Sequence, residues 1–386
     1  MTTYSAVRTT GIYCRPGCGA KPLAENVRTF ELAAAAEAAG YRACLRCRPY
    51  RVAGTAADEA PELVCRAVQL IIAGVLDESG EAALGARLGL SSRHLRRMFH
   101  EHLGVTPDQF ARSRRAHFAR RLLDDSDLGI ADIAFASGFG SLRQFNRAMR
   151  EIFRASPREL RDRRRRTDRL VADGGLVLRL PFTPPYDWSA MSEFLAAQAI
   201  PGVESIEAGV YRRTISLDGD PGLLEIGPGG PDHLLLHAHL PYWEGVIHVA
   251  ERAARLVGAD SEPFARRPGA WGPFEVAVQA VVRDQLPPED AYDVLRKLVE
   301  VYGVPVPGLG HGLTHAFPGA EALTGAELVG PLAQAVASGN IMLDGGENAG
   351  TLVRSLEAVP GVSPKAARHV VLRLGAHHAW FSEAGR

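Results

Sequence analysis

Long apolar runs are missing from this sequence of 386 residues. No stretch approaches the roughly eighteen apolar residues of a membrane-spanning helix, and no secretory segment opens the chain, so we exclude a membrane partner and expect a cytoplasmic protein. Cysteine is also rare, with 5 residues, which is too few for a disulfide-dense secreted scaffold. The length predicts about two to four domains, each with its own core.

The net charge is zero over the whole chain but is unevenly distributed. Residues 1–170 contain 29 Lys and Arg against 19 Asp and Glu, a difference of +10, whereas residues 171–386 contain 15 against 25, a difference of −10. The basic first half indicates a polyanionic partner, and the acidic second half argues against a broad DNA-gripping surface there.

Four of the five cysteines form two close pairs near the N-terminus. Cys14 and Cys18 are spaced C-x3-C, Cys44 and Cys47 are spaced C-x2-C, and the 25 residues 19–43 separate the pairs. Each pair can bind a metal ion from a tight turn, which predicts one Zn²⁺ held by four sulfurs. Two disulfides are the alternative, which a reducing compartment disfavours. The fifth cysteine, Cys65, lies on an apolar helical stretch and is expected to be an inert core residue.

The residues around these cysteines resemble one known zinc domain. The runs T-T-G-I-Y-C-R-P-x-C, E-N-V-R and A-A-G-Y-R-x-C-x-R-C-R-P are similar to the zinc domain of the Ada family, which repairs methylphosphotriesters in DNA. The resemblance implies that Cys14 accepts a methyl group in a single turnover and that the other three cysteines of the site stay as metal ligands. It also implies DNA-backbone contacts from Thr10, Lys21 and Arg42.

Methylation of one thiolate would change the charge of this site. Four thiolates around Zn²⁺ carry a formal charge of −2, and conversion of one of them to a thioether leaves −1. Because phosphate contacts dominate protein–DNA affinity, we expect that loss of negative charge to strengthen promoter binding.

Residues 60–166 contain two similar blocks offset by 50 residues, in which Ser91 matches Ser141. Each block is predicted to be a short helix, a glycine-containing turn, a serine N-cap and a second, arginine-rich helix. An amphipathic helix is predicted over residues 62–76. A long helix is predicted over residues 106–124, with its arginines left available to solvent: Arg112, Arg115, Arg120 and Arg121. An ordinary helical bundle with a solvated basic face is the alternative.

The second block carries a family resemblance in I-A-D-I-A-F-A-S-G-F-G-S-L-R-Q-F-N-R and in the closing S-P-R-E-L-R. Residues 62–164 resemble the AraC-family DNA-binding domain, whose two recognition helices enter successive major grooves of double-stranded DNA. Arginine and glutamine suit guanine and adenine respectively, through paired hydrogen bonds. The candidates for base contacts are Ser92, Arg93, Arg96, Arg143, Gln144 and Arg147.

The second half of the chain carries a further set of motifs on predicted strands and helices. Strands are predicted at residues 176–180, 210–215 and 233–239, with a helix over residues 188–198. The runs L-R-L-P-F-x-P-P-Y-D-W, A-I-P-G-V-E and Y-R-R-T-I are similar to the small α+β domain of AlkA-type 3-methyladenine DNA glycosylases. The run P-F-E-V-A-V-Q-A-V-V-R-D-Q resembles the opening helix of their helix-hairpin-helix domain.

The catalytic parts of such a glycosylase are altered here. Its hairpin holds a phosphate with backbone N–H groups, and a deep Asp stabilises the cationic sugar. The family hairpin L-P-G-I-G-x-x-T-A is replaced by V-P-G-V-S-P-K-A-A, with Ser363 at a glycine position that favours positive φ and Lys365 where a pocket tryptophan is usual. The catalytic Asp would fall on Ala384 or Gly385, so no such Asp is assigned, and Glu383 is the nearby carboxylate.

The sequence therefore predicts a multidomain fold, mainly α with α+β parts. The expected order is a zinc domain (1–55), an all-α double helix-turn-helix domain (60–166), a small α+β domain (170–258) and a helix-hairpin-helix domain (259–386). We expect a promoter-binding regulator that contacts RNA polymerase, is switched by methylation of Cys14, and has a non-catalytic glycosylase-like half. The alternatives are a regulator fused to an active 3-methyladenine glycosylase and a plain DNA-binding factor with structural zinc.

Overall fold

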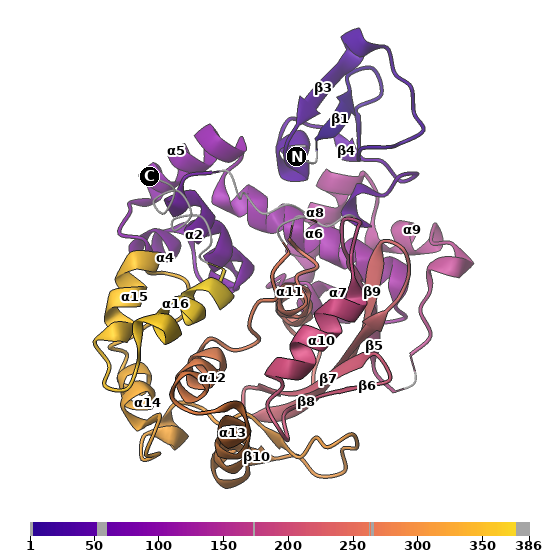
Figure 1. The fold of residues 1–386 in the computed structure, drawn as a ribbon. Coiled ribbons are helices and arrows are strands. Elements are labelled where there is room, and N and C mark those ends of the chain that lie inside the picture. Colours follow the sequence, from indigo (N-terminus) through magenta and orange to yellow (C-terminus); the bar gives the residue numbers. More distant parts are fainter. Residues whose placement is uncertain (1–2, 52–59, 173, 262, 264–265, 376–386) are drawn as a thin grey trace. The chain divides into compact units, whose positions relative to one another are not determined.

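The computed structural model describes residues 3–51, 60–172, 174–261, 263 and 266–375 (Figure 1). Backbone contacts divide the chain into two compact units. The first unit comprises Met1–Ala172, Pro181–Thr183 and Tyr242–Glu251, and the second comprises Asp173–Leu180, Pro184–Pro241 and Arg252–Arg386. Among the described residues, no helix has the length and apolar character needed to cross a bilayer.

The N-terminal part of the first unit is a four-stranded sheet of order β3-β1-β2-β4. Its strands are β1 (Tyr4–Val7), β2 (Ile12–Cys14), β3 (Val27–Phe30) and β4 (Arg42–Ala43), with η1 (Ala24–Asn26) before β3 and α1 (Ala33–Ala38) before β4. β1 pairs antiparallel with β2 and β3, whereas β2 and β4 run parallel. A parallel pair requires a crossover, and β3 and α1 supply it.

The first helix-turn-helix follows η2 (Pro49–Arg51) and consists of α4 (Glu81–Arg87) and α5 (Ser92–Leu103). The helix predicted over residues 62–76 is interrupted into α2 (Glu62–Ile72) and α3 (Val75–Glu78), because Gly74 adopts φ +96° between them. Within α4, a Cβ on Gly85 would lie 2.5 Å from the Leu90 carbonyl oxygen, so the turn requires glycine there.

The second helix-turn-helix consists of α7 (Ile130–Ala136) and α8 (Leu142–Phe153), followed by α9 (Pro157–Asp162) and η3 (Arg166–Asp168). The long helix α6 (Pro107–Asp125) joins the two motifs and begins with a capping box between Thr106 and Gln109. This helix confirms the prediction for residues 106–124.

The prediction that the arginines of α6 are solvent-exposed is wrong for most of them. Arg120 is only 2% exposed and donates to Asp124 in the next turn. Arg115 is half-buried and donates to the carbonyl of Leu76 at 2.7 Å. Elements packed around α6 supply these acceptors, so α6 is a central helix rather than a basic surface.

The second unit contains a sheet of order β5-β9-β8-β7-β6, in which the β6–β7, β7–β8 and β8–β9 pairs are antiparallel. Its strands are β5 (Leu176–Pro181), β6 (Glu204–Glu207), β7 (Val210–Leu217), β8 (Asp220–Pro228) and β9 (His233–His239), and α10 (Trp188–Gln198) packs against β6 and β7. Residues alternate between buried and half-buried along β9, with Leu234, Leu236 and Ala238 in the core. The predicted strands and the predicted helix over residues 188–198 are confirmed.

The helical part of the second unit is built around α12 (Pro273–Gln285), in which residues 275–282 are all buried. The chain enters it through α11 (Val246–Leu256), and the other elements are α13 (Pro288–Tyr302), β10 (Val304–Pro305), β11 (His315–Ala316), η4 (Glu321–Leu323), α14 (Gly330–Ala337), α15 (Ala349–Glu357) and α16 (Pro364–Arg373). Arg213 of β7 is 1% exposed and pairs with Glu275 of α12 at 2.8 Å. This buried ion pair joins the sheet to the helical part.

Candidate metal centre and nucleic-acid interface

Parallel pairing of β2 with β4 brings the two cysteine pairs together. Ile12 is in register with Arg42 and Tyr13 with Ala43, and the N–H of Cys44 donates to the Tyr13 carbonyl at 3.0 Å. Cys14 is the next residue of β2, so its side chain and that of Cys44 lie on neighbouring strand ends. The two cysteine pairs, which are separate in sequence, are thereby brought together in space.

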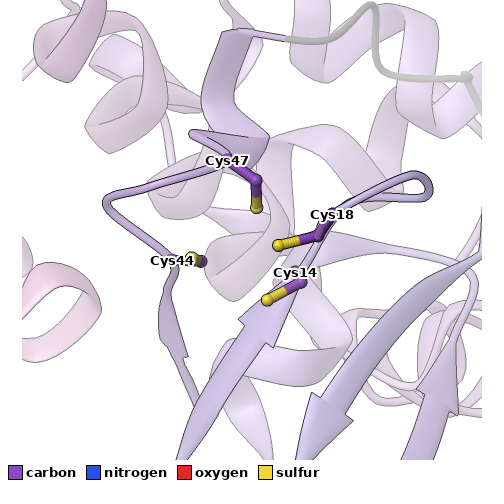
Figure 2. A group of neighbouring side chains, drawn as sticks. All are labelled: Cys14, Cys18, Cys44 and Cys47. Carbon is purple, nitrogen blue, oxygen red and sulfur yellow. The ribbon is translucent and has the colours of Figure 1, made fainter. Parts of the chain in front are cut away.

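Two turns bring Cys18 and Cys47 to the same point. Gly17 adopts φ +73° before Cys18, and the N–H of Arg48 returns to the Cys44 carbonyl at 3.0 Å beyond Cys47. The four sulfur atoms lie within 4.8 Å of one another (Figure 2). Tetrahedral Zn²⁺ with bonds of about 2.3 Å would place its sulfurs about 3.8 Å apart, so a small contraction fits the ion.

The electrostatics of the four sulfurs also fit a cation. Burial, followed by the charges of Cys44 and Cys47, raises the pKa of Cys14 far above that of a free thiol. Burial raises the pKa of Cys47 to about 12. Burial also acts to raise the pKa of Cys44, but N–H groups of Cys47 and Arg46 donate to its sulfur and the net pKa is lowered. Since several thiolates cannot share this volume uncompensated, the donor set suits one Zn²⁺ ion.

Cys14 is the most enclosed of the four ligands, with an exposed fraction of 7%, while the other three are half-buried. Among the predicted backbone-contacting residues, Thr10 and Lys21 are exposed and Arg42 is half-buried. Thr10 and Arg42 lie on adjoining segments, because the N–H of Arg42 donates to the carbonyl of Gly11 at 2.9 Å. Their role in DNA binding stays a prediction.

The predicted base-contacting residues lie on the first two turns of α5 and α8. Ser91 caps α5 by accepting from His94 N–H at 3.3 Å, and Ser141 caps α8 by accepting from Gln144 N–H at 3.2 Å. All the candidates are exposed except Ser92, which is half-buried: Arg93, Arg96, Arg143, Gln144 and Arg147.

Two of these arginines already have acidic partners. Arg96 pairs with Glu81 of α4, and Arg147 pairs with Glu151 one turn later at 2.7 Å. Each must leave its carboxylate or share it before it can bond to a base. In the part of the chain that is described, Arg143 forms no ion pair with a carboxylate, so it is a stronger candidate for base reading than Arg96 or Arg147.

The glycosylase-like hairpin joins α15 to α16 and has its own internal anion. Ser363 adopts φ −77° and caps α16 by accepting from Ala366 N–H at 3.1 Å, so this position does not need the positive φ expected of a glycine. The Ser363 hydroxyl donates to the carboxylate of Asp284, and Lys365 pairs with that carboxylate at 3.0 Å. The hydrogen bond from Ser363 is the main cause that lowers the pKa of Asp284.

The other histidines and carboxylates that the structure describes form no comparable site. His311 pairs with Glu207 at 2.6 Å, and His315 contacts Thr314 at 2.9 Å. In the part of the chain that is described, the cysteine cluster is the only group of three or more ligand-type residues placed to hold a metal. Glu383 and the positions expected for a catalytic Asp, 384 and 385, lie outside the described residues.

Sequence reasoning missed the polar residues that join the cysteine domain to the helices. Glu37 of α1 and Asp124 of α6 were not singled out, yet both accept hydrogen bonds across this interface. A charged residue in an otherwise alanine-rich helix, A-A-A-A-E-A, was the one available signal for Glu37.

Comparison with known families matches each of these regions. The profile described as the metal binding domain of Ada matches residues 2–50. A helix-turn-helix domain profile matches residues 84–163, and the AlkA N-terminal domain profile matches residues 177–265. Together they define a zinc-binding, DNA-binding regulator joined to a glycosylase-like module.

Whole-chain relatives give the family. The chain is 34% identical over 405 aligned positions to the probable bifunctional transcriptional activator/DNA repair enzyme AlkA of Mycobacterium tuberculosis, covering 95% of this chain and 82% of that protein. It therefore belongs to the family of bifunctional transcriptional activators and DNA repair enzymes. The bifunctional transcriptional activator/DNA repair enzyme Ada of Escherichia coli is 36% identical over 122 residues, covering 31% of this chain and 32% of that protein.

A solved structure is similar over part of the chain. A 3-methyladenine DNA-glycosylase from Archaeoglobus fulgidus is 18% identical, with a TM-score of 0.40, and covers 51% of this chain and 79% of that chain.

Proposed function

We propose that this chain is a methylation-responsive transcription regulator of an alkylation response. Cys14 accepts a methyl group from a DNA methylphosphotriester or another methyl donor, and the two helix-turn-helix motifs bind a promoter. Convergence of the four sulfurs within 4.8 Å on a domain that contacts the helix-turn-helix unit carries this proposal. The proposal also includes a cytoplasmic setting, a contact with RNA polymerase and four domains, with the limits 1–55, 60–166, 170–258 and 259–386.

The transfer is a single displacement at carbon. The Cys14 sulfur attacks the methyl carbon of the phosphotriester, an S–C bond forms, and the C–O bond breaks with its electron pair leaving on the phosphate oxygen. The products are a thioether and a phosphodiester anion. A bound Zn²⁺ would keep the Cys14 sulfur deprotonated, so no separate base and no oxidant is required. Because Cys14 is only 7% exposed, the donor must be held close to the end of β2 for its methyl group to reach the sulfur.

The consequence for DNA binding is electrostatic. The site loses one negative charge when the thiolate becomes a thioether, which weakens its repulsion of phosphates. Thr10, Lys21 and Arg42 are the residues that would hold the backbone beside it. Salt dependence of binding should become steeper if additional phosphate contacts form after methylation.

The glycosylase-like half is proposed to be non-catalytic. The N-terminus of a helix favours anions, and in a helix-hairpin-helix that anion is a DNA phosphate. Here the carboxylate of Asp284 already lies at the start of α16, bound by Ser363 and Lys365. A phosphate would therefore meet a fixed negative charge.

An active glycosylase is the second candidate, favoured by the match of residues 177–265 to the AlkA N-terminal domain and by the DNA repair function in the relatives' names. Release of 3-methyladenine from methylated duplex DNA, measured by chromatography, separates the two. We expect no release above a blank. Turnover that Glu383→Ala abolishes would establish the second candidate and end the claim of an inactive half.

Intact-mass spectrometry tests the methyl transfer directly. After incubation with DNA that contains methylphosphotriesters, the zinc-loaded protein should gain one methyl group that peptide mapping assigns to Cys14. Cys14→Ser should gain none, whereas Cys65→Ser, a cysteine outside the cluster, should behave as wild type. Absence of the adduct, with promoter affinity unchanged, would leave a plain DNA-binding factor with structural zinc.

A further inference from the structure

A hydrogen-bonded triad joins the strand of the candidate acceptor to the central helix of the DNA-binding part. The Tyr13 hydroxyl donates to Glu37 Oε1 at 2.6 Å, and His117 Nε2 lies 2.6 Å from the same oxygen. The Tyr13 hydroxyl and His117 Nε2 are 3.1 Å apart, which closes the triangle. Tyr13 belongs to β2, Glu37 to α1 and His117 to α6, so three elements meet at one carboxylate oxygen.

The triad extends to the second recognition helix. The ring of His117 lies 5.9 Å from that of Phe153, the last residue of α8. Arg154, directly after α8, donates to the Gly40 carbonyl at 3.4 Å, and β4 packs against α8. A shift of β2 or α1 therefore acts on α6 and on α8 rather than on α6 alone.

The triad has little room to adjust without losing a contact. Tyr13 is fully buried and its ring packs edge-on against Tyr4 at 5.8 Å. The other oxygen of Glu37 is buried and accepts no hydrogen bond from any of the described residues. If Tyr13 or His117 moved away, the buried carboxylate would lose one of its hydrogen bonds, so the closed arrangement is favoured over a broken one.

The neighbouring Cys14 is where a change of state would originate. It follows Tyr13 in β2 and is 7% exposed, so a methyl group on its sulfur enters a packed environment. Close-packed interiors respond to an added methyl group by shifting side chains or backbone. The nearest backbone to shift is the end of β2, which carries Tyr13.

We propose that the Tyr13–Glu37–His117 triad couples the state of the four-cysteine site to the DNA affinity of the two recognition helices. The inference rests on the proposed function insofar as Cys14 is the residue whose state changes. Tyr13, Glu37 and His117 are assigned a positioning role, because the transfer proposed for Cys14 uses none of them. The competing account is a purely through-space effect of the lost charge, which requires no contact between the cysteine domain and α6.

Two substitutions distinguish these accounts. Tyr13→Phe removes one hydroxyl and keeps the buried ring, and Glu37→Gln keeps the shape but removes the carboxylate. Tyr4→Phe is the matched control, because it removes a buried hydroxyl from the same aromatic pair without touching His117. Each variant is first checked for zinc content by elemental mass spectrometry and for methyl uptake by intact mass.

The readout is a ratio of affinities rather than an affinity. The probe is a duplex selected from a random pool by the zinc-loaded wild-type protein, and its Kd is measured by fluorescence anisotropy before and after methylation, and with zinc bound or chelated. Two ratios of Kd follow, one between unmethylated and methylated protein and one between zinc-free and zinc-bound protein. We expect Tyr13→Phe and Glu37→Gln to retain zinc and methyl uptake, and to reduce these ratios at least about fivefold relative to wild type, which is the lower end of common allosteric coupling. Tyr4→Phe should keep the wild-type ratio.

Wild-type ratios in both variants would overturn the inference in favour of the through-space effect. The inference would also be overturned if the Kd of the wild-type protein changed neither on methylation nor on zinc removal, since the cysteine site and DNA binding would then not be coupled. Failure of the proposed function looks different: no methyl adduct forms at Cys14, whereas the ratio between zinc-bound and zinc-free protein still falls in Tyr13→Phe if the triad acts as proposed.

Discussion

Replacing Asp124 by alanine should loosen the attachment of the zinc domain to α6. The Asp124 side chain is fully buried, and its carboxylate accepts from Tyr50 Oη at 3.0 Å and from Arg51 Nη2 at 3.2 Å. Arg120, one turn earlier on α6, donates to it at 2.5 Å from a side chain that is 3% exposed. The substitution therefore leaves a buried guanidinium without its counter-charge.

The structure gives the size of this effect. Loss of one partner from a buried ion pair commonly costs about 3–5 kcal/mol. Asp125 lies 3.1 Å from Arg51, and Asp168 lies 2.7 Å from Arg48, so part of the negative charge remains nearby. We therefore expect the lower end of the range, about 3 kcal/mol, for opening of α6.

Amide hydrogen exchange of the full-length protein is the appropriate assay, because a multidomain chain does not give one free energy of unfolding. A cost of about 3 kcal/mol corresponds to exchange about a hundredfold faster for the amides of α6 that wild-type protein protects. The matched control is Asp127→Ala, which removes a carboxylate that is 49% exposed and pairs with Arg164 and Arg169. An exposed pair contributes about 0–1 kcal/mol, so exchange in α6 should change less than about fivefold. Equal acceleration in both variants would refute the argument that burial makes Asp124 special.

Two further predictions concern pH and DNA recognition. Burial acts to lower the pKa of His248, but the hydrogen bond to Asp77 at 2.6 Å outweighs burial, and the net pKa is raised. This link between the start of α11 and the α2–α3 region is therefore fully present below about pH 6.5 and is lost as the pH rises through the raised pKa. Protection of the α11 amides from hydrogen exchange should fall over the same range, and His248→Gln should remove that pH dependence. Arg143→Ala should weaken binding to the selected duplex by about 1–3 kcal/mol in a salt-controlled titration, and an equal loss on random DNA would show that Arg143 contacts only phosphate.

The metal ligands and the secondary structure were predictable because their signals are local. Two short-spaced cysteine pairs predict a metal cluster whatever the surrounding fold, and alternating apolar residues predict a strand such as residues 233–239. A helix interruption is also local, but periodicity alone did not give it, because the apolar pattern continues past Gly74 while its backbone turns left-handed.

Hydrogen-bond acceptors supplied by the tertiary fold could not be predicted, because they are distant in sequence and leave no local signal. Arg120 has an arginine's strong preference for solvent, and only the fold places Asp124 and the ring of Tyr50 around it. Asp284 likewise lies 79 residues from Ser363 in sequence, so its place at the start of α16 could not be read from the hairpin motif. Whether the hairpin keeps a phosphate site depends on that distant carboxylate.

Parallel pairing of β2 with β4 has a consequence for when the cysteine site can exist. Cys14 and Cys44 become neighbours only after β3 and α1 have carried the chain across the sheet, so neither cysteine pair can assemble the full ligand set by itself. An emerging or proteolytically clipped chain would hold at most half of the sulfurs. A four-coordinate metal site therefore requires both cysteine pairs on one intact domain.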